Sequence, residues 1–210
     1  LTTAQLAALS TAQVAALETA DLRALSQEQI TALSSTQVAA LGSLQVASLT
    51  SMQIAALEPE DIAALALANF RVLTTAQLQA LDEEQLAALT TAQVASLTTT
   101  QIRALSVSQI AALETADLAS ISTAGIAALL SSQLQGLTSE QIAALTSAQI
   151  RALSTAQLGL LSTEQVAAIE VADLQQLTTV AIRALSSSQV AALTSAQIAA
   201  LGTAQIVALD

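Results

Sequence analysis

The chain has 210 residues, of which 49 are alanine, and it contains no lysine, histidine, cysteine, tryptophan or tyrosine. Without histidine and cysteine it lacks the side chains most used in general-base, thiolate and zinc chemistry. Five arginines against 16 acidic residues give a net charge of −11, which argues against nucleic acid and anionic membrane surfaces as partners. We therefore expect no enzymatic activity, no cofactor and no nucleic-acid binding.

Hydrophobic residues make up 53% of the chain, yet their order argues against membrane insertion. Ser, Thr, Gln or an acid interrupts each apolar run before it reaches the roughly 18 to 20 residues that a spanning helix needs.

From Leu1 onward the sequence divides into 26 octapeptides without insertion or deletion, and the first two read LTTAQLAA and LSTAQVAA. Position 1 of the octad is Leu or Ile throughout, and position 6 is Ile, Leu or Val except at Phe70. Position 5 is Gln in 19 octads, and position 2 is Ser or Thr in 17. This period predicts one continuous repeat array over residues 1–210. Because the chain starts in register and without Met, we expect an excerpt of a longer array or a processed product.

A period of eight fits neither a straight helix, on which the Leu stripe would drift, nor a coiled coil, which needs 3.5 or about 3.67 residues per turn. It does not fit a strand, since positions 1 and 6 have opposite parity. Ala, Leu and Gln favour helix. The sequence therefore predicts a short helix of roughly five to seven residues that restarts in every octad.

Several signals place each helix start after position 2. Ser or Thr there, followed by Gln at position 5, forms a capping box, and the apolar positions 1 and 6 form a hydrophobic staple. Pro59 lies at position 3, where a helix tolerates it. Acids lie at positions 2 to 5 and all arginines at position 7, which suits the helix dipole. We expect an all-α solenoid or superhelix of very short capped helices, one per 8-residue repeat, with its core at positions 1 and 6.

Two features leave alternatives open. The glutamines can cap helices, or can form a ladder between successive turns, or both. The arginines all fall in odd-numbered octads, which is compatible with a 16-residue structural unit, while the number of octads per turn does not follow from the sequence. These arginines are Arg23, Arg71, Arg103, Arg151 and Arg183.

Four octads carry Glu at position 2 together with Asp at position 5. One interpretation is a paired-carboxylate site for Ca²⁺ or for basic groups of a partner. We favour the other, a repeat variant that keeps acids at helix N-termini, because two carboxylates supply too few oxygens for Ca²⁺. The acidic run Asp82, Glu83 and Glu84 predicts a solvated turn. The four pairs are Glu18 with Asp21, Glu58 with Asp61, Glu114 with Asp117, and Glu170 with Asp173.

Phe70, Leu130 and Leu160 are apolar residues that depart from the octad pattern. Each is either an extra apolar contact with a neighbouring turn or chain, or drift of the repeat. Rows of Ser and Thr at positions 2 and 3 also raise ice binding as a minor alternative function.

With the motif L-[ST]-x-x-Q-[ILV]-A-A, as at Leu137–Leu145, the chain resembles octapeptide arrays of large uncharacterised bacterial proteins, many of them secreted or surface-associated. The resemblance covers the whole chain and implies a bacterial, extracellular or cell-surface protein. The motif is also similar to the first helix of some DNA-binding helical repeats, but those are longer and basic or polar beyond it, so we reject DNA binding.

We expect a structural protein that self-associates into a fibre, or into a rod within a surface appendage. The alternative is a rigid spacer or stalk of an adhesin, or a protein–protein interaction scaffold.

Overall fold

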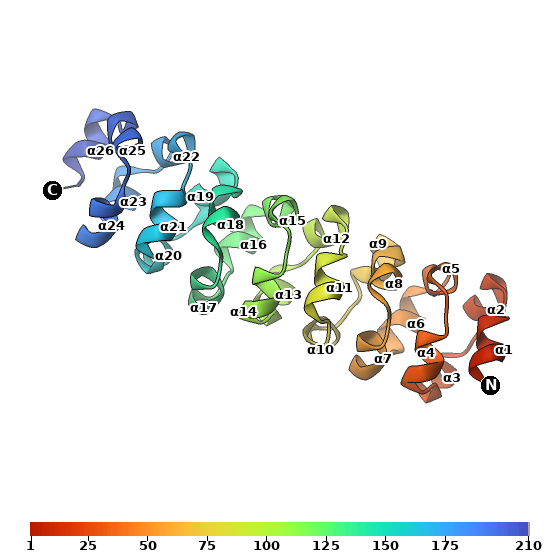
Figure 1. Cartoon of the computed structure of the whole chain (residues 1–210). Helices are drawn as coiled ribbons and strands as arrows, with labels where there is room; N and C mark the ends of the chain where they lie inside the picture. The colour runs from red at the N-terminus through yellow and green to blue at the C-terminus, as the bar shows by residue number, and fades with distance from the viewer. Residues whose placement is uncertain (210) are drawn as a thin grey trace. The chain divides into compact units, whose positions relative to one another are not determined.

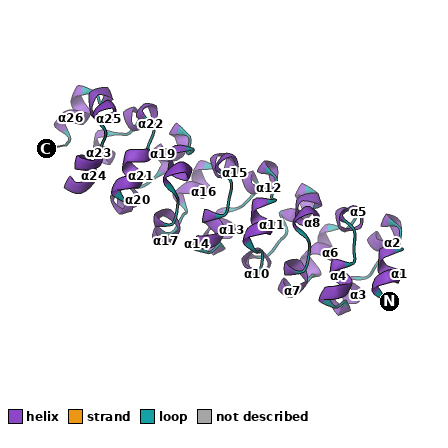
Figure 2. Ribbon diagram, in the orientation of Figure 1, coloured by secondary structure: helices purple, strands orange, loops and turns teal. Residues whose placement is uncertain are grey.

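The computed structural model describes residues 1–209, which form 26 short α-helices joined by short loops, with no strand among them (Figures 1 and 2). The chain divides into two compact units, Leu1–Leu113 and the part from Glu114 onward. The octad register of the sequence runs on across this division. The predicted all-α solenoid of very short helices is confirmed.

The helices of the first unit are α1 Thr3–Ala7, α2 Thr11–Ala15, α3 Thr19–Ala24, α4 Gln27–Thr31, α5 Ser35–Ala39, α6 Ser43–Ser48, α7 Ser51–Ala55, α8 Pro59–Ala64, α9 Leu67–Phe70, α10 Thr75–Gln79, α11 Glu83–Ala87, α12 Thr91–Ala95, α13 Thr99–Ala104 and α14 Val107–Ala111. Those of the second unit are α15 Thr115–Ser120, α16 Thr123–Ala127, α17 Ser131–Gln135, α18 Ser139–Ala143, α19 Ser147–Ala152, α20 Thr155–Leu160, α21 Thr163–Ala168, α22 Val171–Gln175, α23 Thr179–Arg183, α24 Ser187–Ala192, α25 Ser195–Ala200 and α26 Thr203–Val207.

Every helix begins at position 3 of its octad and ends at position 7 or 8, except α9, which ends one residue earlier. The position-2 side chain accepts a hydrogen bond from the position-5 N–H, as in Thr50 to Gln53 at 3.2 Å. The predicted N-cap is therefore confirmed. Among the described helices, the side-chain cap is missing where position 2 is Glu18, Gly42, Glu58, Ala66, Glu114, Leu130, Glu170 or Gly202.

The chain changes direction at positions 1 and 2, which are extended. After α6, Leu49 has φ −59° and ψ 143°, and Thr50 has φ −74° and ψ 159°. None of the described residues has a positive φ or a cis peptide bond. Any amino acid can adopt these angles, so the superhelix needs no glycine at its junctions.

Three helices make one turn of the solenoid. Within each unit, a helix packs against the helix three places along the chain, as α5 does with α8 and α8 with α11 in the first unit. The second unit repeats this with α16 and α19, and with α21 and α24. One turn thus takes three octads. We call a set of helices stacked in this way a column; α2, α5, α8, α11 and α14 form one.

The 16-residue unit suggested by the arginines does not match this period. Arg23 and Arg71 belong to one column of the first unit and Arg103 to another, while Arg151 and Arg183 lie in different columns of the second. Their shared parity therefore has no counterpart in the packing.

The core consists of positions 1 and 6, as predicted. From Leu6 to Ile182 every position-6 side chain is at most 1% exposed, and each such burial contributes about 1.5–3 kcal/mol. Phe70 is fully buried at its position 6, so it is an apolar contact inside the core. Leu130 and Leu160 remain 38% exposed and lie outside the core. Within residues 1–209, no helix combines the length and the apolar character of a membrane span.

Candidate functional site

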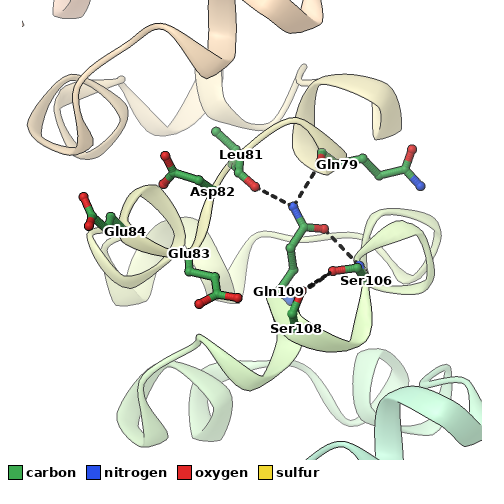
Figure 3. Close-up of a pocket in the computed structure, with 8 residues that line it drawn as sticks. All are labelled: Gln79, Leu81, Asp82, Glu83, Glu84, Ser106, Ser108 and Gln109. Atoms are coloured by element: carbon green, nitrogen blue, oxygen red, sulfur yellow. Dashed lines mark hydrogen bonds between the residues drawn. The ribbon is translucent and has the colours of Figure 1, made fainter.

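Most polar side chains buried in the fold are position-5 glutamines, and each uses one amide for two tasks. Gln109 shows both tasks in Figure 3. Its Oε1 accepts from the N–H of Ser106 at 2.9 Å, which completes the capping box of α14. Its Nε2 donates to the carbonyl oxygens of Leu78 at 2.9 Å and Leu81 at 2.8 Å, on the preceding turn. The amide therefore fixes the start of its own helix and binds the turn before it.

The same bonds recur through both units. The Nε2 atoms reach carbonyls 28 to 31 residues back, which lie where one helix of the previous turn ends and the next begins. We call these residues the glutamine ladder. In the first unit they are Gln29, Gln37, Gln45, Gln53, Gln77, Gln85, Gln93, Gln101 and Gln109. In the second unit they are Gln149, Gln157, Gln165, Gln189, Gln197 and Gln205.

The chemistry of the amide explains why glutamine is preferred. The last carbonyls of a helix have no partner within the helix, and burial makes an unpaired carbonyl costly. Gln carries an acceptor and two donors on a side chain long enough to span adjacent turns, whereas Glu has no donor when ionised. Both interpretations of glutamine, as a cap and as a ladder, are therefore correct together.

Asn69 lies at a ladder position and has a shorter side chain than glutamine. Its Nδ2 donates to the carbonyl of Leu41, 28 residues back, and its Oδ1 accepts from the Ser43 hydroxyl at 2.7 Å. Gly125 and Ala181 offer no side-chain amide, and their helices retain the hydroxyl caps of Ser122 and Thr178.

The four Glu–Asp octads place Asp where the ladder has Gln. Asp61 is 2% exposed, accepts from the N–H of Glu58 at 3.2 Å and is hydrogen-bonded to Ser35 on the preceding turn. Asp173 accepts from the Ser147 hydroxyl in the same way. Asp117 is 4% exposed, whereas Asp21 lies in the first turn and is exposed. Burial raises the pKa of Asp61; its hydrogen bonds to Ser35 and Glu58 lower it, and the charge of Glu60 adds to the rise.

The glutamates of these octads, Glu18, Glu58, Glu114 and Glu170, occupy the N-cap position but make no side-chain cap bond. The pairs are not gathered at one place: α3 and α8 belong to different columns of the first unit, and α15 and α22 to different columns of the second. Within residues 1–209 no group of three or more acidic side chains is arranged to hold a metal ion. The buried Asp side chains are part of the junctions between turns.

Asp82, Glu83 and Glu84, expected as a solvated turn, are exposed but open a helix. The Asp82 carboxylate caps α11 by accepting the N–H of Gln85 at 2.8 Å. Because α11 stacks on α8, these acids share a column with Glu58, Glu60 and Asp61. An open groove of about 620 Å³ between α11 and α14 is lined by the three acids and by Ser106 and Ser108, and Figure 3 draws these residues. This acidic column was missed from the sequence because its members are a full turn apart.

The family model of the ALTTAQ repeat matches residues 14–51, 54–91, 81–115, 110–147, 142–168 and 166–203. Five of these six segments begin at position 6 of an octad, so the family repeat shares the register of the octads. No curated protein matches the chain significantly.

Proposed function

The chain belongs to the ALTTAQ repeat family, and from this we propose that it is a non-enzymatic structural protein whose solenoid forms, or contributes to, an extracellular or cell-surface fibre. The glutamine ladder carries the proposal. Within each unit, a ladder glutamine makes the same kind of bonds to the turn before it at every position that it occupies, so that a stack of such turns can extend by repetition.

Self-association follows from the same regularity. A surface that repeats along a solenoid can contact a second copy in an open, heterologous manner, and such contacts generate filaments. The absence of lysine and the presence of only five arginines leave few sites for trypsin-like proteases, which suits a material outside the cell. The net charge of −11 disfavours nucleic acid as a partner.

A spacer, stalk or interaction scaffold is the second candidate. Leu44 is 82% exposed on α6 and Met52 is 68% exposed on α7, and exposed apolar side chains on successive helices favour contact with another protein. Ice binding is the weakest candidate, because hydroxyls at position 2 such as Thr50 and Ser106 already accept hydrogen bonds from helix amides.

Electron microscopy of the purified protein over a range of concentrations tests the proposal. We expect filaments of uniform diameter that lengthen as the concentration rises. Gln77→Glu, which removes two ladder bonds, should reduce filament length, and Gln13→Glu, which changes an exposed position-5 glutamine outside the ladder, serves as the matched control. Isolated particles at every concentration would overturn the fibre and favour the stalk. Thermal hysteresis in the same sample would instead favour ice binding.

A further inference from the structure

Asp61 occupies a ladder position but, when ionised, has no proton to donate. By the register of the ladder, the carbonyls it would meet are those of Ile30 and Leu33, 31 and 28 residues back. The Ile30 carbonyl accepts the N–H of Leu33 at 3.0 Å. The Leu33 carbonyl lacks the side-chain donor that Gln53 supplies to Leu25 at 2.9 Å and Gln77 supplies to Leu49 at 2.8 Å.

Asn69, one octad later, shows what a side chain of this length can reach. Its oxygen accepts from a hydroxyl 26 residues back, Ser43, just as Asp61 is bonded to Ser35. Its nitrogen also donates to the carbonyl 28 residues back, that of Leu41. Asp61 differs from Asn69 chiefly in lacking that donor.

We propose that protonation of Asp61 strengthens the contact between two turns of the solenoid. While the carboxylate is ionised, the junction between α4 and α5 has no side-chain hydrogen bond to the carbonyl of Leu33. When the carboxylate takes up a proton, the new O–H donates to the carbonyl of Leu33, as the amide of Asn69 donates to Leu41, and the junction tightens.

The charged groups on α8 and on the helices packed against it are all acidic, and the charge of Glu60 raises the pKa of Asp61. Helix α8 packs against α5, which carries no titratable residue, and against α11. Burial is the main cause of the raised pKa of Asp61. Because the pKa is raised in the folded state, the stabilising contribution is complete below the ordinary value of 3.8 and is lost as the pH rises through the folded value. The acids on α8 and at the start of α11 are Glu58, Glu60, Asp82, Glu83 and Glu84.

Hydrogen exchange of the intact chain tests this proposal. It is followed by mass spectrometry at pH 4 and pH 7 and corrected for intrinsic rates. Asp61→Asn should raise the protection of residues 30–36 about fivefold at pH 7, the effect of one net hydrogen bond, and by less at pH 4. Asn69→Asp should do the reverse at residues 38–44, lowering protection at pH 7 and much less at pH 4. Glu28→Gln, which changes an exposed acid on α4, is the matched control and should leave the difference between the two pH values unchanged.

Circular dichroism establishes whether each variant is folded. If Asn69→Asp does not fold, Asp61→Asn decides by itself. An effect of Asp61→Asn that is equal at the two pH values, or no effect at all, would overturn the proposal.

Discussion

Replacing Gln77 by Met removes the hydrogen bonds of this ladder glutamine but keeps a buried side chain of similar length. Gln77 is 2% exposed. Its Oε1 accepts from the N–H of Thr74 at 2.8 Å, and its Nε2 donates to the carbonyls of Val46 at 3.0 Å and Leu49 at 2.8 Å. Met has a similar length but offers no donor and only a weak acceptor. The substitution therefore removes two ladder bonds and the capping contact with Thr74, whose hydroxyl also donates to Oε1 at 3.0 Å, while keeping most of the packing.

The expected loss is about 3 kcal/mol, made up of about 1 kcal/mol for each ladder bond and about 1 kcal/mol for the capping contact. Gln13→Met is the matched control. Gln13 accepts from the N–H of Ser10 at 2.8 Å, but it is exposed and does not belong to the ladder. It loses the capping contact alone, which should cost about 1 kcal/mol.

Urea unfolding followed by far-ultraviolet circular dichroism measures both variants, and hydrogen exchange at residues 46–50 reports on the affected junction. We expect the Gln77 variant to lose roughly 2 kcal/mol more than the Gln13 variant. Equal losses in the two variants would refute the view that the ladder holds the turns together.

Three further predictions concern the core, a cap and the response to acid. Ile142→Asp buries an unpaired charge at a fully buried position and should cost at least about 3 kcal/mol in thermal unfolding, whereas Leu44→Asp, on an exposed side chain, should stay within about 0.5 kcal/mol. Gly42→Ser should raise the midpoint of thermal unfolding by supplying a missing N-cap hydroxyl worth a few tenths of a kcal/mol; its Cβ would lie 3.7 Å from Gln45 Oε1, an ordinary contact. The pKa of Glu164 is lowered by a hydrogen bond from its own backbone N–H and by the hydroxyls of Ser162 and Thr163, so its contribution is present above the ordinary value of 4.5 and is lost as the pH falls through the folded value. Carboxyl NMR should show that low titration, and Glu164→Gln should flatten the acid side of the stability profile.

Local features were predictable because their causes lie within one octad. The cap between Thr50 and Gln53 spans three residues, and the spacing of positions 1 and 6 is visible in the sequence. The number of octads per turn was not predictable, since it depends on the extended angles at junctions such as Leu49, for which the residue types give no signal.

The contacts that the sequence did not predict all depend on the number of octads per turn. The bond between Ser35 and Asp61, and the stacking of the acids of α8 and α11, join residues about one turn apart. Once three octads are known to form a turn, both could have been read from the sequence.

The period of three octads has a consequence for how such an array can change in length. Duplication or loss of one octad keeps the register of caps and core, so the fold survives. It also moves every later residue to the next column, so a change between α8 and α11 would separate their acids into different columns. Length changes of 24 residues would leave the surface pattern intact. Recombination among near-identical repeats could thus conserve the scaffold while redistributing what its sides display.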